Sequence, residues 1–193
     1  QTIEATSPFE SQPLTRLRWA ELDHEIARRL LAVAEGRAVG TLSNGELLAG
    51  ATVRGLVWHD ASARAHCATA AGIVLLAGDP SAVFPQCRIL ADAYRGTEPD
   101  GAPRDHEDIR GPMPSAIDRA IAFIDRNTRH PMHVVGLNRI RLDEYPVEAL
   151  REALVNAVAH RQYEDAGRKI MQEVLADRVV VSSPGLPPSP ITL

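Results

Sequence analysis

The chain has 193 residues, of which 45% are apolar and 24% are charged, and its formal net charge at pH 7 is −4. This length suits one large domain or two small ones, and the apolar content is sufficient to fill a core. No apolar run approaches the roughly 18–20 residues that span a bilayer, so a membrane partner is not expected. The acidic balance argues against a stand-alone DNA-binding protein.

The cysteines and the N-terminus indicate a cellular compartment. Cys67 and Cys87 are isolated in the sequence, which is typical of buried thiols in a reducing cytoplasm and not of a disulfide framework or a zinc site. The N-terminus has neither an initiator methionine nor the pattern of a signal peptide. We therefore expect a cytoplasmic fragment of a longer protein.

The first half of the chain predicts two helices and one ambiguous segment. Residues 1–15 are polar and contain proline, so a loose lead-in is expected there. Apolar residues at helical spacing predict a helix over 18–35 and a weaker one over 44–58, with Asn44 as its N-cap. The apolar run at 69–78 fits either a buried strand or the end of a helix that leads into one, because periodicity cannot decide for so short a run.

The second half alternates between strands and helices. The acidic run Asp105-His106-Glu107-Asp108 could bind a cation, but a solvated loop is the default, and Ser115 is the expected cap of the helix that follows. We expect, in order, a strand at 88–94, a strand at 107–109, a helix at 114–127, a strand at 134–142, a helix from Pro146 to about Gln162, and strands at 170–175 and 178–181 joined by a tight turn. This order predicts an α+β (mixed α/β) fold.

One helix carries the residues best suited to chemistry. Glu152, Asn156 and His160 lie at i, i+4 and i+8, and so share one side of the helix over 147–161. A carboxylate can accept a proton from water, an amide oxygen suits Mg²⁺, and a histidine can contact phosphate. The same stripe is also what any amphipathic surface helix shows. The residues expected on its core-facing side are Val147, Leu150, Ala153, Leu154, Ala157 and Val158.

The motif around this helix resembles a known family. The segment REALVNAVAHRQY, followed by DRVVVSSPGLPP, resembles the start of the GHKL-type (Bergerat-fold) ATP-binding module of bacterial Schlafen-AlbA-type transcriptional regulators, which are also described as RecG-like. Upstream, ATAAGIVLLAGDP, VFPQCRILADAYRG and RGPMPSAIDRAIAFIDRN are similar to further segments of that family. The resemblance covers about residues 20–190.

The resemblance implies a domain organisation and a site. It implies a lead-in at 1–15, a mixed α/β linker domain at 16–130, and a truncated GHKL-like module, the start of a Bergerat α/β sandwich, at 131–193. By position, Glu152 would be the general base of the N-box and Asn156 its metal-binding amide. The other nucleotide-binding positions that the resemblance implies are His160, Arg161, Ser183 and Gly185.

The resemblance also implies partners, and it leaves one alternative open. ATP and Mg²⁺ are the implied cofactors, and DNA is the implied partner through modules outside this chain. The resemblance leaves open whether the full-length protein hydrolyses ATP, and no ATPase activity is expected of the fragment. Catalytic GHKL enzymes have an adenine-binding Asp in a D-x-G-x-G loop, whereas this chain has Ser182-Ser183-Pro184-Gly185 there. The alternative is a non-catalytic scaffold or oligomerisation domain that binds no nucleotide and pairs with a second copy.

Other clusters carry weaker signals. The pair His130 and His133 lacks further ligands at metal-site spacing, so a surface or structural role is expected. No phosphate-binding loop precedes Lys169, and no carboxylate triad indicates a nuclease. The sequence leaves open a local arginine patch on this acidic chain, formed by Arg126, Arg129, Arg139 and Arg141.

Overall fold

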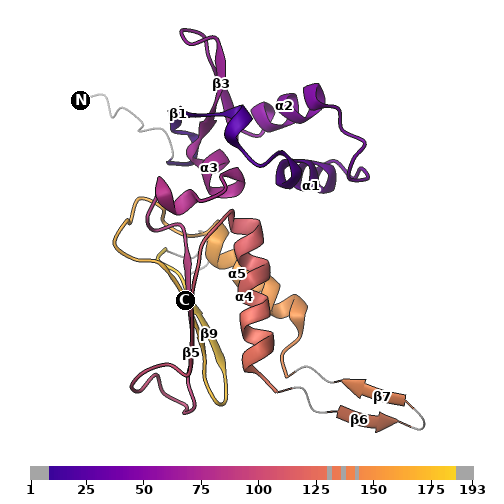
Figure 1. Cartoon of the computed structure of the whole chain (residues 1–193), viewed down its shortest axis with the longest axis vertical. Helices are drawn as coiled ribbons and strands as arrows, with labels where there is room; N and C mark the ends of the chain where they lie inside the picture. The colour runs from indigo at the N-terminus through magenta and orange to yellow at the C-terminus, as the bar shows by residue number, and fades with distance from the viewer. Residues whose placement is uncertain (1–8, 130–131, 136–137, 142–143, 186–193) are drawn as a thin grey trace, which may run out of the picture. The chain divides into compact units, whose positions relative to one another are not determined.

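The chain folds into two compact units of mixed secondary structure. A computed structural model describes residues 9–129, 132–135, 138–141 and 144–185 (Figure 1). The units are Gln1–Val83 and Phe84–Leu193. Each unit joins helices to its own sheet, which confirms the predicted α+β class. The predicted domain assignment came from a family resemblance and stays a prediction.

The first unit contains a small antiparallel sheet with three helices. Its strands are ordered β1-β3-β2, and the register pairs Pro13 with Thr69 and His59 with His66. Its core includes Ala27, Leu31 and Leu47. The elements are the 3₁₀ turn η1 (Phe9–Ser11), β1 (Pro13–Arg18), η2 (Trp19–Glu21), α1 (His24–Ala34), α2 (Asn44–Val53), β2 (Val57–Asp60), β3 (Ala65–Thr69), α3 (Ala70–Leu76) and η3 (Pro80–Ala82).

Close backbone packing joins α3 to the segment that follows α2. The Thr69 hydroxyl caps α3 by accepting from the Gly72 N–H, and it donates to the Gly55 carbonyl at 2.6 Å. A Cβ atom at Gly72 would lie only 1.9 Å from the Leu56 carbonyl oxygen. Only glycine therefore allows α3 to approach the backbone this closely.

The second unit is built on a four-stranded mixed sheet. The order is β5-β4-β8-β9, in which β4 and β8 run parallel while the outer pairs are antiparallel. A separate antiparallel pair, β6 and β7, lies between the two helices in sequence. The elements are β4 (Ile89–Ala93), β5 (Asp105–Ile109), α4 (Met113–Asn127), β6 (Met132–Val135), β7 (Asn138–Arg141), α5 (Val147–Ala159), β8 (Ile170–Val174) and β9 (Val179–Ser182).

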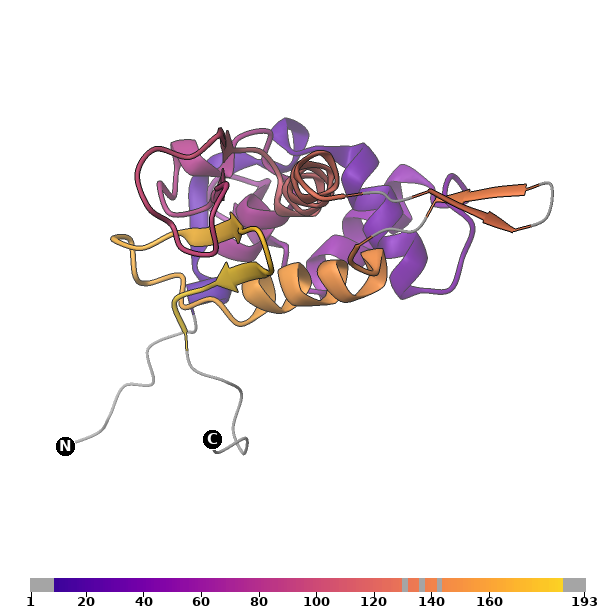
Figure 2. The same cartoon turned by 90° about the horizontal axis from the view of Figure 1, so that it is seen from below.

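Helices α4 and α5 lie on the same face of this sheet (Figures 1 and 2). Helix α4 contributes buried Ala120, Phe123 and Ile124, and α5 contributes buried Leu154 and Val158. Buried Gln172 on β8 donates from Nε2 to the Ala120 carbonyl at 3.2 Å, which ties the central strand to α4. The sheet and the two helices therefore share one core, and this core fixes the position of α5.

Several predicted elements differ from the structure. The ambiguous run at 69–78 is mainly a helix, because Thr69 provides a cap and the buried strand ends there. The helix predicted over 44–58 ends at Val53 and is followed by β2, and its N-cap is Ser43 rather than Asn44. Ser115 does not cap α4, whose N-cap is Pro112. The strand expected at 134–142 is a pair of strands, and β1 occupies part of the expected lead-in.

Candidate functional site

Helix α5 rests on a narrower apolar face than the sequence predicts. Of the six residues expected to face the core, Leu154 and Val158 are buried, whereas Leu150 and Ala157 are only half-buried. Val147 is 40% exposed and Ala153 is exposed, so that part of the prediction is wrong. The contacts of α5 run mainly to α4 and β9, and these two neighbours cover only a narrow stripe of its surface.

The polar stripe of α5 faces solvent. Glu152, Asn156 and His160 are all exposed. The Asn156 side-chain NH₂ donates to Glu152 Oε1 at 2.9 Å, a contact that the i, i+4 spacing allows. His160 is the C-cap residue, and its N–H donates to the Asn156 carbonyl at 3.0 Å. Because the Asn156 NH₂ group is hydrogen-bonded to Glu152, the amide oxygen of Asn156 is the atom available to a cation.

The turn after β9 packs against the C-terminal end of α5. The Ser183 hydroxyl donates to the Ala157 carbonyl at 2.7 Å, and the Gln162 N–H donates to the Pro184 carbonyl at 2.7 Å. A Cβ atom at Gly185 would lie 2.3 Å from the His160 carbonyl oxygen. This packing brings Ser183 and Gly185, far from α5 in sequence, next to His160.

Arg161 organises the loop that follows α5. It is 4% exposed, and its guanidinium donates to the carbonyls of Gln162 and Asp165 at 2.9 Å each and also to that of Arg168. The group lies over the Tyr163 ring at 5.0 Å, and burial lowers its pKa from the ordinary arginine value. These contacts make Arg161 part of the framework beneath the stripe, a role that its position in the motif does not indicate.

The stripe on α5 offers oxygen atoms that a divalent cation could use. Among the residues that the structure describes, no group of three or more His, Cys, Asp and Glu side chains could hold a metal by itself. Mg²⁺ usually takes only one or two protein oxygens and completes its shell with water and phosphate oxygens. The exposed oxygen of Asn156, beside the Glu152 carboxylate, is a donor set of that kind.

The predicted buried thiols are confirmed. Cys67 and Cys87 are both free and buried. Burial raises the pKa of the Cys87 thiol to about 12, so it stays protonated and unreactive at neutral pH. Cys87 therefore contributes no nucleophile to the candidate site.

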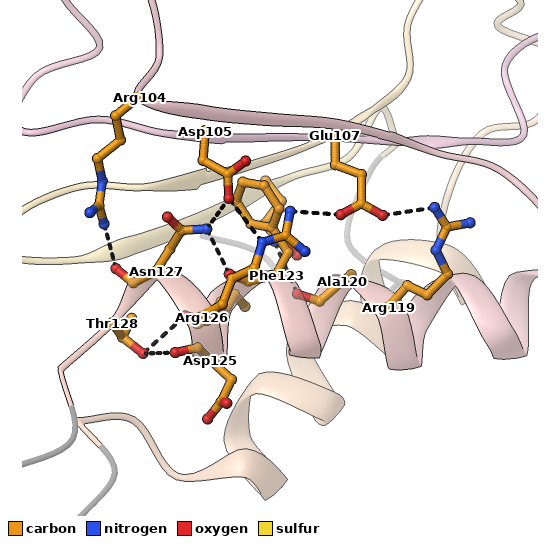
Figure 3. Close-up of polar contacts among 12 residues, drawn as sticks. Arg104, Asp105, Glu107, Arg119, Ala120, Phe123, Asp125, Arg126, Asn127 and Thr128 are labelled. Carbon is orange, nitrogen blue, oxygen red and sulfur yellow. Dashed lines mark hydrogen bonds and ion pairs between the residues drawn. The ribbon is translucent and has the colours of Figure 1, made fainter.

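A charged network links β5 to α4, at a place where the sequence indicated a solvated acidic loop. Arg126 donates to Asp105 at 2.9 Å and to Glu107 at 2.8 Å, and Arg119 reaches Glu107 at 2.7 Å (Figure 3). The Asn127 amide adds a hydrogen bond to Asp105 at 2.7 Å. The alternation of Asp105 and Glu107 along a strand, facing arginines two helical turns apart, is the sequence signal that could have revealed this network.

Comparisons with known proteins support the fold alone. The DIP2311 protein of Corynebacterium diphtheriae, known from a crystal structure, shares this fold with a TM-score of 0.69 and 20% sequence identity. The match covers 98% of this chain and 36% of that one, so the chain spans about a third of the length of that protein. No family model matches the chain, and no curated protein matches it.

Proposed function

We propose that the exposed face of α5 is half of a GHKL-like Mg-ATP site in a transcriptional regulator that contacts DNA through other modules. The observation that carries this proposal is the solvent-exposed pair of Glu152 and Asn156, hydrogen-bonded at 2.9 Å. Asn156 supplies the oxygen for the nucleotide's Mg²⁺, and Glu152 supplies a base for water. The family resemblance described above supports the same assignment.

The docked turn gives this half-site a fixed boundary. Ser183 and Gly185 are held against the end of α5 by a 2.7 Å hydrogen bond and by a contact too close for a side chain. A nucleotide bound along the stripe would be bordered on one side by the C-terminal end of α5 and by this turn. Burying and orienting the nucleotide fully requires further protein groups, as expected of a half-site.

Isothermal titration with Mg-ATP tests the proposal. The unaltered protein is expected to bind, and Asn156→Ala is expected to weaken binding roughly tenfold because it removes the oxygen ligand. Glu148→Gln is the matched control, since Glu148 is exposed on the same helix one turn before Glu152. Absence of binding, or equal affinities for all three proteins, would reject a nucleotide site on α5.

A second candidate function is a scaffold that binds no nucleotide. It is favoured by the hydrogen bond from the Ser183 hydroxyl to the Ala157 carbonyl. Through this bond, the residue at the position of the adenine-binding Asp holds the turn against α5 instead of facing a ligand. Val155, 40% exposed on α5, adds an apolar group that a second copy could cover. Sedimentation of the protein with and without Mg-ATP separates the two functions: a dimer that forms through α5, ignores nucleotide and is weakened by Val155→Ser favours the scaffold.

A further inference from the structure

A polar cavity lies in the second unit where β4, β8 and α4 end. Strands β4 and β8 run parallel and end in register at Ala93 and Val174, and the Tyr94 N–H bonds the Val174 carbonyl at 2.8 Å. Beyond these strand ends is a cavity of about 260 Å³, bounded also by the end of α4 and by Glu144. Ligands of open α/β sheets commonly bind beyond the carboxyl ends of parallel strands.

Four arginines from three parts of the unit converge on this cavity. Arg95 follows β4, Arg104 precedes β5, and Arg126 and Arg129 lie at and just after the end of α4. Glu144 is the carboxylate among the lining residues. These four arginines line the cavity in a chain whose formal net charge is −4. The cavity is therefore a local concentration of positive charge against an acidic background.

Two of these arginines are already engaged by the fold. Arg126 is matched by Asp105 and Glu107, and Arg104 donates to the Asn127 carbonyl at 2.6 Å (Figure 3). That carbonyl lies at the C-terminal end of α4, where the helix dipole is negative, so Arg104 offsets a charge that would repel an anion.

The other two arginines have no side-chain partner among the described residues. Arg95 and Arg129 are exposed, and within the described part of the chain their guanidinium groups make no hydrogen bond or ion pair. Glu144 accepts the backbone N–H of Arg129 at 3.0 Å, so the anchoring of this segment leaves the Arg129 side chain available. These two side chains provide the surplus positive charge at the cavity.

We propose that this cavity binds the phosphate groups of a nucleotide or of a nucleic acid strand. Guanidinium groups match phosphate oxygens with paired, charge-assisted hydrogen bonds, and arginine is the usual residue for this recognition. The volume of about 260 Å³ is below the roughly 300–1,000 Å³ typical of pockets that enclose drug-sized ligands, so it suits a phosphate-bearing part of a larger molecule. The site is distinct from the stripe on α5 and does not depend on it.

Binding of three probes in the presence of EDTA tests this proposal. The probes are pyrophosphate, ADP and a fluorescent oligothymidylate, each measured with the unaltered protein and with the double variant Arg95→Gln/Arg129→Gln. At least one probe is expected to bind, and the double variant is expected to bind it roughly tenfold or more weakly. Loss for the oligothymidylate alone identifies a nucleic acid strand as the ligand, whereas loss for pyrophosphate and ADP identifies a free nucleotide.

Two control variants make the outcome specific. Arg29→Gln removes one exposed charge in the first unit and should leave binding unchanged. Asn156→Ala should also leave it unchanged, which separates this site from the proposed Mg-ATP site. The proposal is overturned if no probe binds, or if the double variant, with a melting curve like that of the unaltered protein, binds as tightly as Arg29→Gln. If the double variant melts early, each single variant replaces it, and the same two results decide.

Discussion

At the residue scale, two glycines mark places where backbones meet too closely for any side chain. Gly72 lies against the Leu56 carbonyl in the first unit, and Gly185 lies against the His160 carbonyl in the second. The sequence alone does not show why glycine is needed at either position, because the carbonyl that each glycine contacts is remote from it in sequence. Such contacts set the position of α3 and of the turn after β9.

Replacing Gly72 by alanine should destabilise the first unit by about 2–3 kcal/mol, since a methyl group 1.9 Å from a carbonyl oxygen forces the backbone to shift. Gly78→Ala is the control, because a Cβ there has no atom within 4 Å and the conformation is not left-handed. Urea unfolding of both variants measures the difference. A cost for Gly72→Ala no larger than that for Gly78→Ala would show that the packing is looser than described.

Arg161 should not tolerate lysine. Its buried guanidinium donates to the carbonyls of three loop residues, and a single ammonium group cannot span the same positions. We expect Arg161→Lys to cost about 2–3 kcal/mol in urea unfolding. Arg168→Lys, at a side chain that is 67% exposed, should cost at most about 0.5 kcal/mol. Similar costs for both would contradict the framework role of Arg161.

At the element scale, prediction succeeded where one pattern dominated. The helix at 114–127 and the strands at 88–94, 170–175 and 178–181 were found within one or two residues, because amphipathic period or alternation runs unbroken through them. The sequence left 69–78 undecided, because an apolar run fits either structure and a tertiary contact through Gly72 decides. Prediction missed β2, because the end of α2 and the start of that strand read as one continuous segment.

The link between β5 and α4 should make stability depend on pH. Hydrogen bonds from Arg126 hold the pKa of Asp105 below its usual value. Burial alone would raise the pKa of Glu107, but hydrogen bonds from Arg126 and Arg119 lower it overall. A carboxyl with a depressed folded pKa stabilises the protein above its unfolded pKa, and this contribution is lost as the pH falls through the folded pKa.

We therefore expect the free energy of unfolding to fall as the pH drops below about 4. Arg126→Gln should cost about 1 kcal/mol near neutral pH, because these side chains are partly exposed, and it should cost less in acid. Urea titrations across pH measure both effects, with Arg29→Gln as a control that should follow the unaltered protein. If Arg126→Gln lowered the free energy of unfolding by the same amount at all pH values, this result would contradict the charged network between β5 and α4.

At the scale of the whole molecule, the chain combines two compact units with a candidate site on the second. Among the described residues, no helix is long and apolar enough to cross a membrane. Sequence spacing placed Glu152, Asn156 and His160 on one face, and all three are exposed there. Spacing could not show that Ser183 and Gly185 dock beside His160 or that Arg161 is buried, because both depend on how β9 and the loop at 162–168 return to α5.

The most direct test of a Mg-nucleotide site on α5 replaces Mg²⁺ by paramagnetic Mn²⁺ and follows backbone amide signals by NMR. With ATP present, we expect Mn²⁺ to broaden signals around Glu152 and Asn156, and we expect Asn156→Ala to abolish this broadening while Glu148→Gln preserves it. Broadening that is absent from α5, or that survives Asn156→Ala unchanged, would contradict a Mg-nucleotide site on this helix.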